Sequence, residues 1–364
     1  MLTLRLLRQR GSLVVGARAL STAAGSGGTQ IVNLDDQRTV VKVQGETLLP
    51  YLQKIISNDA SQLVPGAPPI YACVLTPQGR FLHDMFLHAV EGKRSRTQSA
   101  DGRPVPSVLV DCDAQQRRAL MDLLQRYSLH HKIDVTSASK HYSVFAAFGS
   151  GLAGAATVPE RDWPKDPRLP ALGRRAVLPR GSAPAPTASW RDYQQWRIMQ
   201  GVAEGDTEIP SGEVNPLEFN LDRLNGVSFA KGCYVGQEFV QRVHARGVVR
   251  KRIMPFRLGE ARGAGCLAAV PLDPRSSHVF DVFDADESLR PIGRVRAVQG
   301  GVGLAKLRLK EAMAAIQEGK PLLIGDLEAG TGYATITPWR PDWWDPAWGY
   351  EEAGFGEEEQ RKVA

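Results

Sequence analysis

The sequence has few cysteines, and none of them lie close together. Cys73, Cys112, Cys233 and Cys266 are the only four among 364 residues, and no Cys-x-x-Cys pair occurs. Closed zinc sites and self-contained iron–sulfur sites normally take four ligands, often in close pairs. We therefore expect no metal centre that this chain holds alone. Scattered cysteines also indicate a reducing compartment, where no disulfide framework is expected.

Long apolar runs are absent as well. No stretch of about 18 apolar residues occurs, which is the length that a transmembrane helix needs. Acidic residues are missing from the first 34 positions, which hold Arg5, Arg8, Arg10 and Arg18 among leucines and valines. An arginine-rich, acid-free, amphipathic start is typical of a mitochondrial transit peptide, which we assign to residues 1–28. A merely disordered basic tail is the alternative.

The positive charge of the whole chain gives little support to nucleic-acid binding. The net charge is +6, and the four arginines of the N-terminal segment contribute most of it. A second basic segment, residues 241–252, carries four arginines and one lysine. We interpret it as a solvated face at a domain boundary in preference to an anion-binding patch.

Residues 29–250 show the mixed pattern of an α+β protein. Apolar residues at helical spacing predict helices over 46–57 and 114–129, and a capping box predicts a third helix beginning after Ser189. Strands are predicted over 39–43, 71–75, 81–87 and 143–148, with a hairpin turn at 77–79. Residues 149–188 are dense in glycine, alanine and proline, and we interpret them as a long irregular excursion.

The C-terminal part has a different sequence pattern. Short strands alternate with glycine turns over residues 251–340, which predicts a small antiparallel barrel. Residues 341–364 form a tail that is first rich in tryptophan and then acidic. Such indoles serve either as a docking segment or as a clamp that holds the terminus on the last domain, and the sequence leaves both readings open.

The octapeptide 231–238, Lys-Gly-Cys-Tyr-Val-Gly-Gln-Glu, is the candidate functional site. Gly232 and Gly236 allow positive φ or close approach of a ligand. Lys231 and the start of a following helix favour a charged sulfur on Cys233. The competing interpretation is that a lone cysteine is a small buried hydrophobe.

With the octapeptide, the segments 52–59, 75–80 and 215–218 resemble the YgfZ-like family, which is related to the glycine-cleavage T-protein. With the transit peptide, the chain is most similar to the mitochondrial iron–sulfur cluster assembly factors of that family. The resemblance implies a ring of three domains: two interleaved α+β domains and a C-terminal antiparallel β-barrel. In T-proteins the central channel of this ring holds tetrahydrofolate.

The chain departs from T-proteins at three positions. Where T-proteins carry two adjacent aspartates, the first tied to aminomethyl transfer, this chain has His83-Asp84. The position of the pterin-binding glutamate is taken by Met199, and Cys233 stands where T-proteins have an aspartate in the octapeptide region. An imidazole and a thioether are poor substitutes for these carboxylates.

These departures favour a non-enzymatic assembly factor of the mitochondrial matrix. The resemblance implies that Cys233 donates one thiolate to an iron–sulfur cluster shared with an A-type carrier protein, and that four-iron proteins are matured as a result. Lys231 would hold the thiolate, Tyr234 would shield it, and Gln237 with Glu238 would fix the loop. The alternatives are a tetrahydrofolate-dependent aminomethyl transferase, and a covalent nucleophile Cys233 activated by a base such as His244.

Overall fold

The computed structural model describes residues 28–91, 105–128, 131–153, 159, 162–246, 248–262, 280–284, 291–325 and 333–349. The predicted transit peptide, apart from residue 28, therefore lies outside the described residues. So do Cys266, His130 and residues 350–364. None of the described helices is both long and apolar enough to cross a membrane.

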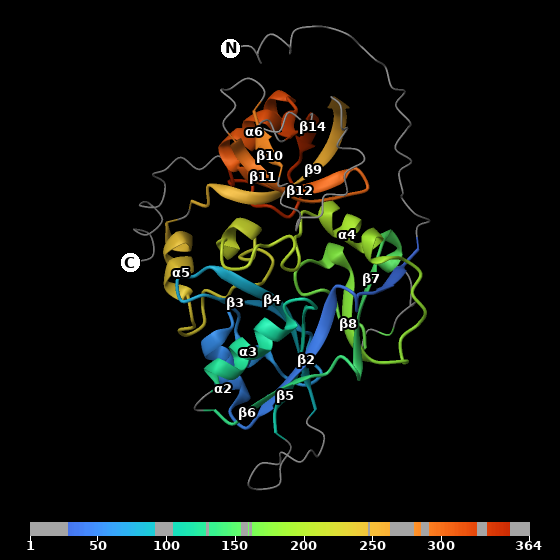
Figure 1. Ribbon diagram of the computed structural model, residues 1–364, viewed down its shortest axis with the longest axis vertical. Coiled ribbons are helices and arrows are strands. Elements are labelled where there is room, and N and C mark those ends of the chain that lie inside the picture. Colours follow the sequence, from blue (N-terminus) through green and yellow to red (C-terminus); the bar gives the residue numbers. More distant parts are fainter. Residues whose placement is uncertain are drawn as a thin grey trace.

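Two antiparallel sheets form the α+β part of the molecule (Figure 1). The smaller sheet has the order β1-β7-β8, with bounds β1 (Gln30–Asn33), β7 (Tyr142–Phe148) and β8 (Arg174–Pro179). The larger sheet has the order β3-β4-β5-β2-β6, with bounds β2 (Arg38–Gly45), β3 (Ile70–Leu75), β4 (Phe81–Val90), β5 (Ser107–Asp113) and β6 (Ile133–Ser137). All five strands of the larger sheet fall between β1 and β7 in the chain. The interleaving implied by the family resemblance is thus confirmed.

Two amphipathic helices pack on the larger sheet. They are α2 (Leu48–Ile55) and α3 (Arg117–Tyr127), each slightly shorter than predicted. Leu52 and Leu120 lie with Val110 of β5 in one buried cluster. The 3₁₀ helix η1 (Ala60–Gln62) follows α2. The predicted hairpin is also present, since the Gly79 N–H donates to the Thr76 carbonyl at 2.9 Å.

The interpretation of residues 149–188 as irregular is wrong in part. Besides the 3₁₀ helices η2 (Ser150–Ala153) and η3 (Pro170–Leu172), this region contains strand β8, which pairs with β7. The strand reads Arg-Arg-Ala-Val-Leu-Pro and therefore shows no apolar alternation. Arg175 is nevertheless fully buried, because ion pairs within the fold compensate its charge.

The capping box predicted after Ser189 is confirmed at the start of α4 (Trp190–Met199). The Ser189 hydroxyl accepts from the Asp192 N–H at 3.4 Å, and the Asp192 carboxylate accepts from the Ser189 N–H at 2.8 Å. Tyr193 of this helix is buried against Phe148 of β7. Tyr193 thus belongs to the core of the fold, with Trp190 and Trp196 partly buried against it.

A closed six-stranded antiparallel barrel forms the C-terminal part, as predicted (Figure 1, top). Its strand order is β10-β11-β12-β9-β14-β13. The elements are β9 (Lys251–Arg262), β10 (Asp281–Phe283), β11 (Pro291–Gln299), β12 (Val302–Arg308), α6 (Leu309–Glu318), β13 (Leu322–Gly325) and β14 (Tyr333–Pro338). The domain boundaries at residues 29–250, 251–340 and 341–364 stay a prediction.

The described tryptophans of the tail clamp the chain onto the fold. Trp344 and Trp348 are buried in the barrel core, and the Trp343 indole donates to the Gln200 carbonyl at 2.8 Å. The Arg252 guanidinium lies 3.4 Å from the centroid of the Trp348 ring. Of the two readings of this segment, burial supports the clamp.

A buried ion network joins the two sheets. Arg38 of β2 and Arg175 of β8 both bind Asp111 of β5, at 2.7 and 2.6 Å. The Glu204 carboxylate forms ion pairs with Arg175 at 3.0 Å and with Arg168 at 2.7 Å. The guanidiniums of Arg38, Arg168 and Arg175 all lie over the ring of Phe86, at 5.5, 4.7 and 3.9 Å. The further members of this network are Asp84, Asp166, Arg197 and Glu208.

The partly buried His88 is expected to make the stability of the fold sensitive to mild acid. Burial lowers its pKa from 6.5 to about 4, and its Nε2 atom is enclosed without a hydrogen-bond partner. The unfolded chain then binds the proton first as pH falls from 6.5 to 4, so the folded state loses up to about 3 kcal/mol over this window. Urea unfolding measures the free energy of unfolding at pH 7.5 and at pH 5. We expect this free energy to fall less between the two pH values in His88→Phe than in the wild type. An equal loss in both proteins would contradict this prediction, and His141→Gln at an exposed position is the control.

Candidate functional site

The octapeptide lies at the start of α5 (Gln237–Ala245), beside the hairpin of β3 and β4 (Figure 1). The 3₁₀ helix η4 (Pro216–Phe219) packs in the same region. One apolar core extends from Tyr234 and Val240 through this part to Ile253 of the barrel. The loop that carries the thiol is therefore fixed to the centre of the molecule.

Lys231 anchors the loop at its first residue. Its ammonium group donates to the carbonyls of Ile56 and Asn58 at 2.7 and 2.8 Å, and it lies 4.8 Å from the Tyr234 ring centroid. Burial lowers the pKa of Lys231 to about 8, and the charge of Asp59 opposes that shift. The sequence placed this ammonium beside the sulfur, but the structure directs it to buried carbonyl groups. A buried ammonium must satisfy its own donors first.

Tyr234 and its neighbours form the second anchor. The Tyr234 side chain is buried in the core, and its N–H donates to the Gln237 side-chain oxygen at 3.2 Å. The Val235 N–H donates to the Lys54 carbonyl at 3.0 Å. The expectation that Gln237 fixes the loop agrees with this bond. Glu238 is exposed in the first turn of α5, where a carboxylate complements the helix dipole.

The two glycines of the octapeptide differ in what they allow. Gly236 has φ of +79°, and a Cβ there would lie 2.4 Å from the Thr76 carbonyl oxygen. Gly232 does not have a positive φ, and a Cβ there would meet open space. Close packing thus requires glycine only at position 236, whereas Gly232 leaves room beside the thiol.

Replacing Gly236 with alanine is expected to destabilise the protein by more than about 1 kcal/mol, because the new methyl group clashes with backbone and the positive φ is strained. Gly232→Ala is the matched control, and we expect it to change the free energy of unfolding by less than about 0.5 kcal/mol. Urea unfolding of both variants checks the prediction. Equal stability of the two variants would contradict it.

Cys233 is exposed, between the two anchors. Cys73 and Cys112 are buried, and burial raises the pKa of both thiols, that of Cys73 to about 12. Within the described ranges, no group of three or more His, Cys, Asp or Glu side chains is placed to hold a metal ion. Of the three cysteines that the structure describes, Cys233 alone offers its sulfur to a partner or ligand.

The residues at the T-protein positions do not recreate a free carboxylate. Burial lowers the pKa of His83, so its imidazole is neutral near pH 7. Asp84 is bound by Arg38 at 2.8 Å and accepts from the Gly205 N–H at 3.3 Å. Met199 is exposed at the end of α4. This arrangement offers no ionised, unpaired carboxylate at either position 83 or position 84.

His244 is not placed as a base for Cys233. Its ring stacks on Phe229, with centroids 3.6 Å apart and an interplanar angle of 11°. No hydrogen bond joins it to Cys233 in the described part of the chain. His131 bonds the Thr47 hydroxyl at 3.1 Å through Nδ1. The nucleophile hypothesis therefore lacks a positioned base among these residues.

Sequence reasoning missed a basic pocket on the barrel. Its cationic residues are spread along three strands, so no local motif identifies them, and they are Lys251, Arg294, Arg296, Lys306 and Arg308. Part of the basic segment 241–252 behaves differently from the solvated face that we expected. Arg252 is buried and binds Asp222 at 3.0 Å.

Comparisons with known proteins agree with these features. Residues 250–346 match the family described as the CAF17 C-terminal beta-barrel domain. The glycine cleavage system aminomethyltransferase T from Bartonella henselae has a similar fold, with a TM-score of 0.57, 14% identity and coverage of 88% of this chain and 87% of that one. At this identity the similarity shows the fold alone.

Two curated relatives carry nearly the same name. The iron-sulfur cluster assembly factor IBA57 homolog, mitochondrial, from Mycosarcoma maydis is 32% identical and covers 84% of this chain and 83% of its own length. The human iron-sulfur cluster assembly factor IBA57, mitochondrial, is 33% identical, with coverage of 85% and 84%. These names confirm the predicted mitochondrial location. The chain belongs to the family of mitochondrial IBA57 iron–sulfur cluster assembly factors.

Proposed function

We propose that the protein is a non-catalytic assembly factor of the mitochondrial matrix whose Cys233 ligates an iron–sulfur cluster shared with a partner protein. One observation carries the proposal: Cys233 is exposed on a loop whose two ends are anchored in the core. The family membership supplies the chemistry, because the curated relatives are named as cluster assembly factors. The cluster is the cargo of this site.

The donor set suits a shared cluster better than a resident one. A thiolate is a soft ligand that suits iron, and iron–sulfur clusters normally take four protein ligands. The loop offers one exposed sulfur, while Cys73 and Cys112 are buried. The remaining ligands therefore come from the partner, and the interface forms around Gly232 and Cys233. The open space at Gly232 supports this, since a bulky side chain there would stand beside the cluster.

The A-type carrier proteins are the partners that we propose, and four-iron proteins are the clients that mature through this complex. The loop is preformed, because Lys231 and Tyr234 are both buried on either side of the thiol. A preformed loop loses little conformational entropy on docking. Gln237 contributes by holding the turn before α5, and Glu238 lies exposed in the first turn of that helix.

Tetrahydrofolate-dependent aminomethyl transfer is the second candidate, favoured only by the fold. The structure supports it poorly, because His83 is neutral and Asp84 is bound by Arg38. A carboxylate that orients a reacting amine must be ionised and accessible. We therefore propose no catalytic residue for this chain.

The test mixes the mature chain anaerobically with a cluster-loaded A-type carrier. We expect a heterocomplex whose absorption and electron paramagnetic resonance spectra differ from those of the carrier alone. Calorimetric titration with tetrahydrofolate runs in parallel. Unchanged carrier spectra together with tight folate binding and one-carbon turnover would replace this proposal with the transferase.

A further inference from the structure

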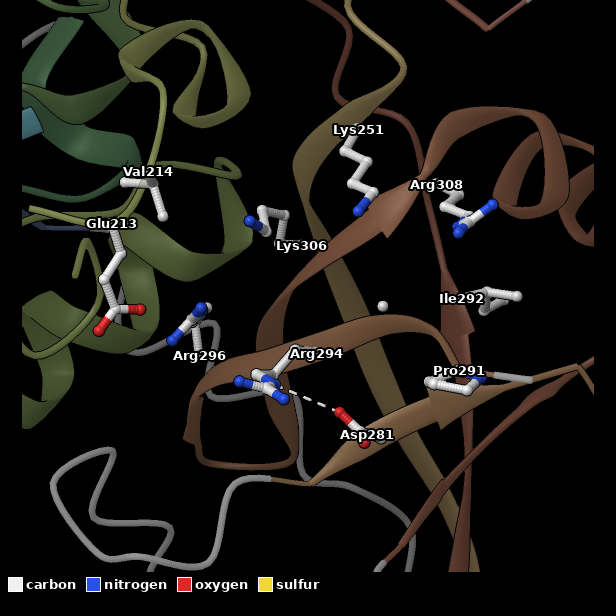
Figure 2. Close-up of a pocket in the computed structure, with 11 residues that line it drawn as sticks. Glu213, Val214, Lys251, Asp281, Pro291, Ile292, Arg294, Arg296, Lys306 and Arg308 are labelled. Atoms are coloured by element: carbon white, nitrogen blue, oxygen red, sulfur yellow. Dashed lines mark hydrogen bonds and ion pairs between the residues drawn. The ribbon is translucent and has the colours of Figure 1, made fainter. Parts of the chain in front are cut away.

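A pocket of about 290 Å³ lies on the barrel, and none of residues 231–238 lines it (Figure 2). Strands β9, β10, β11 and β12 form most of its wall, and residues 213 and 214 line its α+β side. Five cationic side chains line it, namely Lys251, Arg294, Arg296, Lys306 and Arg308, against the carboxylates of Glu213 and Asp281. Figure 2 shows these side chains around one opening.

The carboxylates near the pocket leave part of this charge uncompensated. Arg294 binds Asp281 at 3.2 Å, and Lys306 binds Glu218 at 3.2 Å. Arg308 lies 3.9 Å from Glu311. Among the described residues, Lys251 and Arg296 form no ion pair.

The charges of Glu213 and Glu218 act on Arg296, but neither carboxylate forms an ion pair with it. The Nε atom of Arg296 is enclosed without a hydrogen-bond partner. Burial and the neighbouring charge of Arg294 lower its pKa, and the charges of Glu213 and Glu218 oppose that shift only in part. A partly buried guanidinium whose N–H donor has no acceptor is stabilised when an anion binds to it.

The rest of the lining selects a compact ligand. The described lining residues include no aromatic side chain, so the pocket offers no stacking surface for a nucleobase or a pterin ring. Guanidinium groups match the geometry of phosphate oxygens in a bidentate manner. Lys251 and Arg308 also line a neighbouring pocket of about 400 Å³ together with Arg250 and Lys310. The positive surface therefore continues beyond the first pocket.

We propose that this barrel pocket binds a compact anion with two or more phosphate groups, held chiefly by Lys251 and Arg296. Figure 2 shows Arg296 beside Arg294 and Lys251 beside Arg308, so one phosphate is held by Arg296 and Arg294. The next extends toward Arg308 and the neighbouring pocket. This site is separate from the cluster chemistry proposed for Cys233.

Isothermal titration of the mature chain with inorganic tripolyphosphate tests the proposal. We expect one site in wild type and affinity at least about tenfold weaker in Lys251→Gln/Arg296→Gln, because two charge-assisted contacts are lost. The control Arg118→Gln/Lys140→Gln removes the same charge from exposed positions and should stay within about twofold of wild type. Cys233→Ser should bind tripolyphosphate like wild type. Circular dichroism confirms that each variant is folded.

Three outcomes would overturn the assignment. Equal weakening in both double variants would show attraction to net charge alone. Citrate that binds as tightly as tripolyphosphate would assign the pocket to carboxylates. A peptide of residues 351–359, which holds five glutamates, would assign it to an acidic polypeptide segment if it bound more tightly than tripolyphosphate.

Discussion

Cys233→Ser is expected to abolish the cluster-bridged complex with an A-type carrier while leaving the fold intact. A serine hydroxyl is a hard, weakly acidic group and replaces a thiolate poorly as a ligand of iron. The side chain is exposed, so we expect the free energy of unfolding to change by less than about 0.5 kcal/mol. Anaerobic size-exclusion chromatography with absorption detection measures the complex, and urea unfolding measures the stability.

A buried cysteine is the matched control for this result. Cys73 is fully buried on β3, and its sulfur lies 3.2 Å from the Ser57 hydroxyl. Cys73→Ala should lower stability by about 1 to 2 kcal/mol through the space it leaves, yet the folded fraction should still form the complex. A Cys233→Ser protein that assembles a cluster with normal spectra would exclude Cys233 as the shared ligand.

Asp111→Asn is expected to destabilise the protein by about 3 to 5 kcal/mol, the cost of leaving buried charge without its partner. Asp111 is fully buried and binds both Arg38 and Arg175. The amide keeps the shape of the carboxylate but neither its charge nor its acceptor capacity toward two guanidiniums. Urea unfolding at pH 7.5 measures the difference, and Arg180→Gln at the half-exposed pair with Asp35 is the control.

The surface control should lose less than about 1 kcal/mol, because solvent screens exposed ion pairs. The dependence of wild-type stability on acidic pH provides a second measurement. Burial alone would raise the pKa of Asp111, but Arg175 and Arg38 outweigh it and hold the pKa below 3.8. Its stabilisation is therefore present above about pH 4 and is lost as pH falls through the folded-state value. An Asp111→Asn protein as stable as wild type would mean that the network contributes nothing to folding.

Local signals in the sequence predicted the elements that local contacts determine. The capping box at Ser189 and the hairpin turn at Gly79 involve residues within four positions of each other. Strand β8 escaped prediction because its buried Arg175 is stabilised by carboxylates distant in sequence. The pairing of β1 with β7 is equally non-local, and the family resemblance implied only that the two domains interleave.

The orientation of the octapeptide residues could not be predicted from the sequence. The octapeptide indicated a thiol between glycines, yet only the fold distinguishes Gly236, which packs against Thr76, from Gly232. The direction of the Lys231 ammonium depends on carbonyl groups of residues 56 and 58, far away in the chain. The cations of the barrel pocket come together only when the barrel closes.

The buried ion network also determines the order in which the chain can fold. Arg38 and Asp111 are 73 residues apart, and Arg175 lies 64 residues beyond Asp111. Closing such long loops costs conformational entropy before the ion pairs can form and offset it, which makes folding slow. In a chain that emerges from its N-terminus, Arg168 and Arg175 precede their partner Glu204. The buried charges of Arg168 and Arg175 therefore lack this partner until residue 204 is available.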